Sequence, residues 1–355
     1  MLAPTQLTSI AVALATTLAG QQLAQAEPAT GLRFSHGDWE IACSNTRQCQ
    51  LAGYPPNEGE DGVSVLLSRR AGPNQAIKAQ LQLAHWDENS SLQKAPQKFN
   101  LTFKLNQRNL GKISMNKTDW IGDLSAEQTQ ALLQALTRKS EIVFEYVNQQ
   151  WQLSDKGAAA VLLKADEFQG RLDTSQAWIK KGSKAESSVL PEIAKPVIKR
   201  VRLPKAQPQD ESFIKKNYAE LLASLRKTDQ KDDCPAIRAE AETKPELSAQ
   251  RLNANQFLVS ASCWRAAYNE GDGYWLVNAS KPFKPELVTT YANDFDDGII
   301  SSNQKGRGLG DCWSSTDWVW DGKQFQLSAS SHTGMCRLIA PGGAWQLVTH
   351  ETEVK

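Results

Sequence analysis

The chain has 355 residues, of which 40 are basic and 39 acidic, so its formal net charge at pH 7 is only +1. This balance lacks the basic excess of nucleic-acid-binding proteins, and the length exceeds what one ordinary hydrophobic core accommodates. We therefore expect two domains and no nucleic-acid partner. The eleven Trp residues are many for this length, and they serve either as core filler or as a platform for a ligand.

The first 26 residues have the pattern of a secretory signal peptide. An apolar run, Ile10–Gly20, precedes Ala24 and Ala26, which form an A-x-A cleavage site. The run is shorter than the roughly 18 residues of a membrane-spanning helix, and no later run approaches that length. The segment before the run lacks Lys and Arg, which leaves a buried or amphipathic N-terminal helix as the alternative. The pattern predicts cleavage after Ala26, a periplasmic or secreted location and no transmembrane segment in the mature chain.

Six cysteines follow, and in an exported chain an even number predicts disulfides. Six cysteines can pair in many ways, but sequential pairing keeps each bridge inside one domain. A metal site is disfavoured because no two cysteines have C-x-x-C spacing and the four His residues are scattered. The predicted bridges are Cys43–Cys49, Cys234–Cys263 and Cys312–Cys336.

Residues 27–181 have the pattern of a β-rich N-terminal domain. Alternation of apolar and polar residues predicts several strands joined by short loops. Ser125 and Gln128 have the spacing of a capping box, which predicts a helix that continues to Arg138 and Lys139. A second helix is predicted over Lys156–Phe168. The predicted strands are Phe34–Cys43, Cys49–Ala52, Val63–Ser68, Ala76–Leu83, Phe99–Leu105 and Glu141–Val147.

Residues 182–210 differ in composition from the segments on either side. Prolines occur at 191, 196, 204 and 208, among Lys, Glu and Ser residues. Proline at this density resists both helix and central strand. We interpret the segment as an extended linker in which Val197–Leu203 forms a short edge strand.

The sequence pattern of residues 211–355 predicts an antiparallel β domain. Phe213, Leu221, Leu222 and Leu225 have helical spacing and indicate a helix at its start. Short strands separated by turn residues then predict a meander or small barrel. The fold class predicted for the whole chain is therefore α+β and β-rich, with two antiparallel β domains, a few flanking helices and disulfide staples. The predicted strands are Gln256–Ser262, Tyr274–Val277, Glu286–Thr290, Trp318–Trp320, Phe325–Ala329 and Trp345–Val348.

Several of these residues resemble a known family. They are Phe34, Trp39, Cys43 and Cys49, then GRGLGDC at 306–312, WVWDG at 318–322, FQL at 325–327 and CR at 336–337. They are similar to a family of exported bacterial proteins that carry a domain of unknown function, and the N-terminal half is similar to the invasion-associated locus B family. Trp313 and Leu338 depart from the pattern, which has small residues, usually Gly, there. The resemblance implies a proteobacterial periplasmic or secreted protein without assigned activity and carries over no catalytic residue.

No motif for nucleotide binding, zinc hydrolysis or a nucleophilic serine is present in the sequence. His332 and Cys336 suggest a nucleophile pair, but a Cys336 that is bridged to Cys312 offers no thiolate. Arg307 and Asp311 are interpreted as an ion pair that fastens the glycine loop, with ligand binding as the alternative. The sequence therefore predicts no catalytic residue, metal or cofactor.

The aromatic residues of the C-terminal domain either line a sugar- or peptide-binding face or fill its core. Strand alternation puts Trp318 and Trp320 on one face, which favours core packing for that pair. The predicted ligand face comprises Arg307, Asp311, Trp313, Trp318 and Trp320. The wider aromatic set adds Trp264, Tyr268, Tyr274 and Trp275.

The acidic segment 293–298 has the composition of a calcium loop, but its ligand order does not fit an EF-hand, so we interpret it as a solvated turn. The leading hypothesis is an exported, non-enzymatic binding or envelope-associated module with an unknown ligand or envelope partner. The alternative is a hydrolase acting on cell-wall or sugar material through two facing carboxylates. Its candidate carboxylates are Asp294, Asp296, Asp311 and Asp317.

The domain boundaries predict the outcome of limited proteolysis. Protease should cut first between Gly182 and Asp210, because an extended proline-rich linker exposes its backbone, and should leave two resistant fragments. Mass spectrometry of the fragments measures the cut sites. Early cuts inside residues 27–181 or 211–355 would contradict the boundaries.

Overall fold

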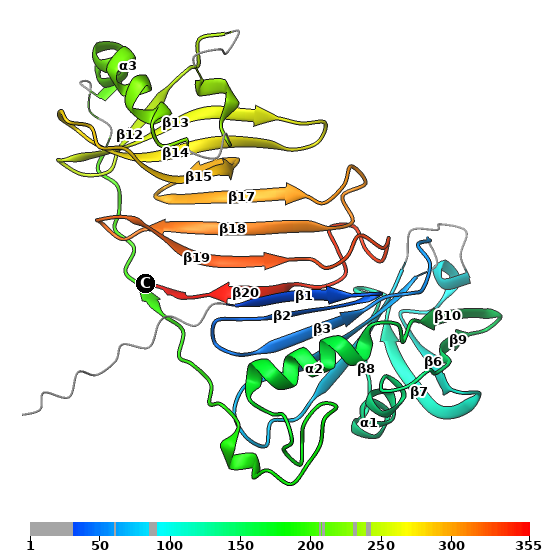
Figure 1. Cartoon of the computed structure of the whole chain (residues 1–355). Helices are drawn as coiled ribbons and strands as arrows, with labels where there is room; N and C mark the ends of the chain where they lie inside the picture. Colours follow the sequence, from blue (N-terminus) through cyan, green and yellow to red (C-terminus); the bar gives the residue numbers. More distant parts are fainter. Residues whose placement is uncertain are drawn as a thin grey trace, which may run out of the picture.

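A computed structural model of the chain describes residues 31–59, 62–84, 91–205, 207, 210–229, 233–238 and 243–355. The predicted signal peptide lies outside these residues. The described part is α+β and β-rich, with antiparallel sheets, flanking helices and three disulfides, as the sequence predicts. Figure 1 shows the sheets following one another along the molecule, with α3 at one end and α1 and α2 near the other. None of the described helices is long and apolar enough to cross a lipid bilayer.

The N-terminal sheet is formed by β1–β10. All of its neighbouring strands are antiparallel, in the order β1-β2-β3-β4-β5-β8-β7-β6-β9-β10. The alternation that predicted β6 recurs in its burial, with Phe99, Leu101 and Phe103 buried. The strands are β1 (Leu32–His36), β2 (Trp39–Cys43), β3 (Cys49–Gly53), β4 (Val63–Arg69), β5 (Lys78–Leu83), β6 (Lys98–Leu105), β7 (Arg108–Asn116), β8 (Ile121–Asp123), β9 (Ile142–Tyr146) and β10 (Gln149–Leu153).

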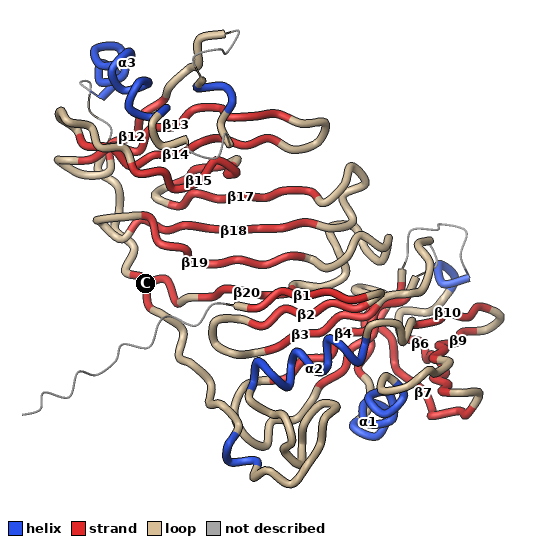
Figure 2. The backbone as a smooth tube through the Cα atoms, viewed as in Figure 1, coloured by secondary structure: helices blue, strands red, loops and turns tan. Residues whose placement is uncertain are grey.

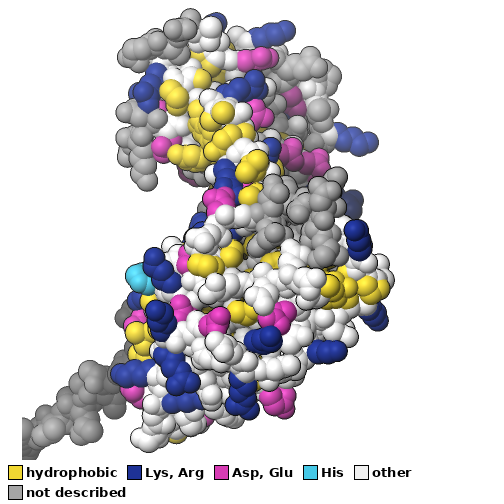
Figure 3. Space-filling view, turned by 90° about the vertical axis from the view of Figure 1, so that its right-hand side faces the viewer, with side chains coloured by type: hydrophobic (Ala, Val, Ile, Leu, Met, Phe, Trp, Pro, Cys, Tyr) yellow, Lys and Arg dark blue, Asp and Glu magenta, His cyan; other side chains and the backbone are white. Residues whose placement is uncertain are grey.

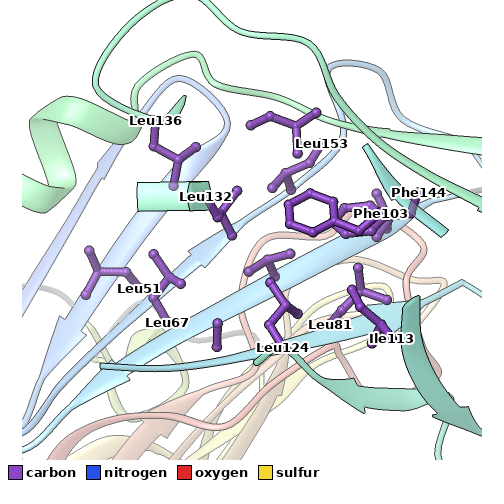
Figure 4. Packing of buried hydrophobic residues seen from close by; sticks show 14 of the residues in the cluster. Leu51, Leu67, Leu81, Phe103, Ile113, Leu124, Leu132, Leu136, Phe144 and Leu153 are labelled. Carbon is purple, nitrogen blue, oxygen red and sulfur yellow. The ribbon is translucent and has the colours of Figure 1, made fainter. Parts of the chain in front are cut away.

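Two helices cover the core of the N-terminal sheet. α1 (Ala126–Ala135) starts at the predicted capping box, in which Ser125 and Gln128 exchange side-chain and backbone hydrogen bonds. α2 (Ala158–Gln169) ends at Gly170, whose φ of 67° suits glycine. Leu132 of α1 packs among leucines of β3 and β4, and Phe103 lies on Phe144 with ring centroids 4.9 Å apart (Figure 4).

Residues 248–351 form two further antiparallel sheets, which we call the α3-side sheet (β12–β15) and the central sheet (β16–β20) (Figure 2). α3 (Asp210–Arg226) covers one face of the α3-side sheet through Leu221 and Leu225. The strands are β12 (Ser248–Arg251), β13 (Gln256–Arg265), β14 (Glu270–Asn278), β15 (Glu286–Ala292), β16 (Asp294–Asp296), β17 (Ile299–Lys305), β18 (Trp313–Trp320), β19 (Phe325–His332) and β20 (Leu347–Glu351).

The predicted strands at β13–β15 and β18–β20 are confirmed, but the prediction joins β1 and β2 into one strand and misses β7, β8, β10, β12, β16 and β17. β17 reads IISSNQK, and its polar second half lacks the alternation on which the prediction relied. Its partners on both sides hold it in place, with Ser301 opposite Asp294 and Asp317. Tertiary pairing, rather than local sequence, decides this strand.

The linker runs along one side of the molecule toward α3 (Figure 1). Most of residues 191–197 are exposed, while Ile198 is buried and belongs to β11 (Val197–Ile198), which pairs in parallel with β21 (Glu353–Val354). This two-residue strand lies within the segment where an edge strand was expected. The domain boundaries themselves stay a prediction.

The C-terminal part of the chain also packs on the N-terminal sheet. Trp345 and Leu347 form a buried cluster with Tyr54 and Leu66 of the N-terminal half. Trp345 Nε1 donates to Ser64 Oγ at 2.7 Å, and the side chain of Gln50 binds the backbone of β20 at Val348 N (2.9 Å). A buried seam therefore joins the two halves.

The described cysteines form the three sequential bridges favoured by the sequence: Cys43–Cys49, Cys234–Cys263 and Cys312–Cys336. A Cβ added to Gly306 would lie 2.5 Å from Cys312 Sγ and 2.9 Å from Cys336 Sγ. The signature loop 306–312 is thus packed directly on its own bridge.

The Cys312–Cys336 bridge should contribute more to stability than Cys43–Cys49, because it closes the longer loop. Their sequence separations are 24 and 6, and loop entropy gives about 3–4 kcal/mol for the first bridge and about 2 kcal/mol for the second. Calorimetry of the double variants Cys312→Ser/Cys336→Ser and Cys43→Ser/Cys49→Ser measures this order. Alkylation of Cys336 in the native oxidised protein would contradict the bridge.

Candidate functional site

A cleft of about 360 Å³ opens where the α3-side sheet meets the central sheet. The turn between β13 and β14 forms one wall, and residues of β17 and β18 form the other. Its lining residues are Arg265, Ala266, Ala267, Tyr268, Asn269, Glu270, Asn293, Asn303 and Trp313. The strand ends near this cleft are on the side seen in Figure 3, where hydrophobic side chains gather on the upper half among acidic and basic ones.

The cleft exists because strand pairing stops short along one edge of β17. β16 pairs with β17 only as far as Ser301, and side-chain amides continue the bonding beyond it. Asn293 accepts from Asn303 N at 3.0 Å and donates to Asn303 O at 2.9 Å. Asn269 forms the same pair of bonds with the backbone of Lys305, both at 2.9 Å. The amides satisfy backbone groups that a strand would otherwise pair, and so they fix the walls of the cleft.

Two aromatic side chains flank the cleft. Tyr268 is 46% exposed, and a Cβ on Gly308 would lie 3.5 Å from its ring. Trp313 is half-buried and donates from Nε1 to Gly310 O at 3.0 Å. The ammonium group of Lys305 lies 5.4 Å from the Trp313 ring centroid. The glycine loop therefore positions both rings.

Two arginines near the cleft, Arg265 and Arg307, are paired with carboxylates. Arg265 binds Glu270 at 2.8 Å. Arg307 binds both carboxylate oxygens of Asp311, at 2.7 and 2.6 Å, and also pairs with Glu58. Burial would raise the pKa of Asp311, but the hydrogen bonds from Arg307 and from the Leu338 amide outweigh it and hold that pKa below its usual value. The Arg307–Asp311 pair fastens the loop, as the sequence suggested.

The structure does not gather the predicted ligand face in one place. Trp313 lines the cleft, whereas Trp318 and Trp320 lie toward the other end of β18. Trp320 has no exposed surface and packs on Phe325, with centroids 5.2 Å apart, so it belongs to the core. Arg307 and Asp311 support the cleft from the loop without lining it. Sequence reasoning had Tyr268 in its wider aromatic set but missed the asparagines, which carry no motif.

The candidate carboxylates of a hydrolase are placed differently from one another. Asp311 is buried and held by Arg307. Asp294 and Asp317 lie opposite Ser301 from its two sides, and Asp317 Oδ1 accepts from Ser301 Oγ at 2.7 Å. The acidic segment 293–298 forms the β16–β17 hairpin. Among the described residues, one group of His, Cys, Asp or Glu side chains has its ligand atoms close enough together to hold a metal ion. It consists of Asp311, Cys312 and Cys336, and its two cysteines are joined in a disulfide.

A second polar cluster lies in the seam between the halves. Tyr54 donates to Glu40 at 2.7 Å and accepts from Met335 N at 3.1 Å. His332 is 4% exposed, with Nδ1 3.7 Å from Glu40 and Nε2 without a partner among the described residues. Because Cys336 is bridged, His332 serves no thiolate. This cluster joins the two halves of the chain through buried hydrogen bonds.

The sequence matches known proteins over most of its length. Residues 33–352 match the family described as "Protein of unknown function (DUF1176)". The "Uncharacterized protein YpfG" of Escherichia coli (strain K12) is 27% identical over 312 residues, which are 82% of this chain and 84% of YpfG. No solved structure gives a significant match. The expected likeness of the N-terminal half to the invasion-associated locus B family stays a prediction.

The buried His332 predicts a loss of stability in acid. Burial, with Arg33 nearby, lowers its pKa to about 4, whereas an unfolded chain holds a His pKa of about 6.5. As pH falls from 6.5 toward 4 the unfolded chain takes up a proton that the folded chain does not, so the free energy of unfolding should fall by about 2–3 kcal/mol.

Urea denaturation at pH 7.5 and pH 4.5 tests this, with His332→Gln as the reference. Burial raises the pKa of Glu40, so protonation of Glu40 in acid raises the free energy of unfolding and opposes the effect of His332. Glu40 is present in both proteins, and its contribution therefore largely cancels in the comparison. Equal pH dependence of the two proteins would show that His332 is protonated in the folded state as readily as in the unfolded state.

Proposed function

We propose that this chain, which belongs to the family described as "Protein of unknown function (DUF1176)", is an exported, non-enzymatic binding module that holds a saccharide in the cleft beside Tyr268 and Trp313. The observation that carries the proposal is the combination of two aromatic rings with fixed amide groups around one cavity. The family description assigns no activity, so the proposal rests on this geometry.

A saccharide suits both kinds of group. A sugar ring has apolar C–H faces, which stack on aromatic side chains, and hydroxyl edges, which exchange hydrogen bonds with amides. Tyr268 offers an exposed ring, and Asn303 lies beside Trp313 in the lining. Since Arg265 is already paired with Glu270, the cleft favours an uncharged, hydroxyl-rich ligand over a strongly charged one.

Export is proposed from the disulfides and from the N-terminal pattern. Three bridges use all six cysteines, and such bridges persist in oxidising compartments. The apolar run before Ala24 and Ala26 supports cleavage of a signal peptide. A periplasmic or secreted protein would meet saccharides of the cell envelope.

A carboxylate-based hydrolase is the second candidate, and one observation favours it. Asp294 and Asp317 share a face of the central sheet, one strand on either side of Ser301. Two strand spacings separate their backbones by roughly 10 Å, near the upper end of the carboxylate separation in inverting glycosidases. Release of reducing ends from an oligosaccharide, abolished in Asp317→Asn, would support this candidate.

Replacing Tyr268 by Ala should weaken saccharide binding by about tenfold, because the loss of a stacking ring removes about 1–1.5 kcal/mol. Isothermal titration of the mature protein with oligosaccharides of glucose and of N-acetylglucosamine measures the affinity. Tyr291→Ala is the matched control, since Tyr291 is 50% exposed and does not line the cleft. Binding that is unchanged in Tyr268→Ala, or lost equally in Tyr291→Ala, would contradict the proposed cleft.

A further inference from the structure

The cleft continues into a row of polar side chains on one face of the central sheet, which we call the polar row. Strand register defines it, because Lys305 lies opposite Trp313, Asn303 opposite Ser315, and Ser301 opposite Asp317. Side chains two residues apart on a strand point to the same face. Trp313, Ser315 and Asp317 therefore follow one another from the cleft along β18.

Hydrogen bonds hold the polar row in position. Ser315 Oγ donates to Asn303 Oδ1 at 2.8 Å, and Ser301 Oγ donates to Asp317 Oδ1 at 2.7 Å. Among the described residues, the second carboxylate oxygen of Asp317 has no hydrogen-bond partner. Asn303 lines the cleft together with Trp313. The row thus presents fixed acceptors and donors at regular intervals.

Small neighbours and the absence of covering helices leave the polar row open. Asp317 lies opposite Ala329 of β19, and Ser315 lies opposite Ser331. These four side chains are only partly buried. In Figure 2 none of the described helices crosses β17, β18 or β19.

The dimensions indicate a chain rather than a single ring. Alternate residues on a strand are about 7 Å apart, so Trp313 and Asp317 are separated by roughly 14 Å. The cleft itself, at about 360 Å³, lies at one end of this span. A single sugar that fills the cleft cannot reach Asp317, but an oligosaccharide can.

We propose that the ligand is an oligosaccharide chain, one unit of which occupies the cleft while the following units lie along the polar row and bind Ser315 and Asp317. This inference rests on the proposed function. It adds the length and direction of the ligand and assigns two residues that select for chain length. Asp317 accepts hydrogen bonds from hydroxyl groups of the bound chain, and the small side chains of Ala329 and Ser331 on β19 leave room for the sugar rings.

Titration with saccharides of increasing length tests the inference, with glucose and N-acetylglucosamine oligomers from two to six units as probes. Affinity of the wild-type protein should rise at least tenfold between two and four units. The variant Ser315→Ala/Asp317→Ala should keep the affinity for the disaccharide and lose this rise. Its matched control is Ser314→Ala/Thr316→Ala, which changes the opposite face of the same strand and should keep the rise. Circular dichroism establishes that both variants are folded.

The outcomes separate this inference from the proposed function. Equal affinity for all lengths, still weakened by Tyr268→Ala, would overturn the polar row and leave the cleft. Loss of the rise in the Ser314/Thr316 control would also overturn it. Affinity that is insensitive to Tyr268→Ala would overturn the proposed function itself. Shortening of the hexasaccharide by the wild type and not by Asp317→Asn would support a chain on the polar row and overturn the non-enzymatic part of the proposed function.

Discussion

Backbone groups at the edge of a sheet need partners, and in this molecule side-chain amides supply them wherever one sheet passes into the next. Asn269 and Asn293 bind the backbone of β17 between the α3-side and central sheets. Asn45 and Gln50 bind the backbone of β20 between the central and N-terminal sheets, at Glu351 and Val348. A side-chain amide offers the same donor and acceptor as a peptide group. It therefore joins the sheets while leaving room beside the strands, and the cleft occupies that room.

The signature loop converts this junction into a shaped site. Gly306 packs against the Cys312–Cys336 bridge, where a side chain would collide with both sulfur atoms. The Arg307–Asp311 pair closes the loop, and the Leu338 amide adds a further hydrogen bond to the carboxylate. The loop contacts both rings of the cleft, through Gly308 beside Tyr268 and through the Gly310 carbonyl, which accepts from Trp313 Nε1. The loop residues thereby position the two rings beside the cleft.

The seam between the halves is polar as well as apolar, which restricts how the halves can pack. Tyr54 and Glu40 bind one another and the chain at Met335, and Arg337 binds Asp38 at 3.0 Å. Gly334 has a φ of 96°, and a Cβ there would lie 2.1 Å from the Tyr54 hydroxyl oxygen. A buried polar group left unpaired costs about 1–3 kcal/mol. A shifted arrangement would leave several such groups unpaired, so the seam favours one orientation of the central sheet.

The sequence by itself determined the elements whose signals are local. The capping box at Ser125 predicted the start of α1, and alternating apolar and polar residues predicted β6. The even number of cysteines predicted disulfides, and the expectation that each bridge stays inside one domain favoured the three pairings that form. The sequence also included Trp313 in the predicted ligand face; the structure places Trp313 in the lining of the cleft, and its contact with a ligand stays a prediction. Strand alternation already favoured core packing for Trp320, which is buried in the structure. The tertiary structure alone decided that polar β17 is a strand and that Asn293, Asn303 and Tyr268 line one cleft with Trp313. These outcomes depend on pairing between segments far apart in the chain. An asparagine that replaces a strand partner looks, in sequence, like any asparagine in a turn.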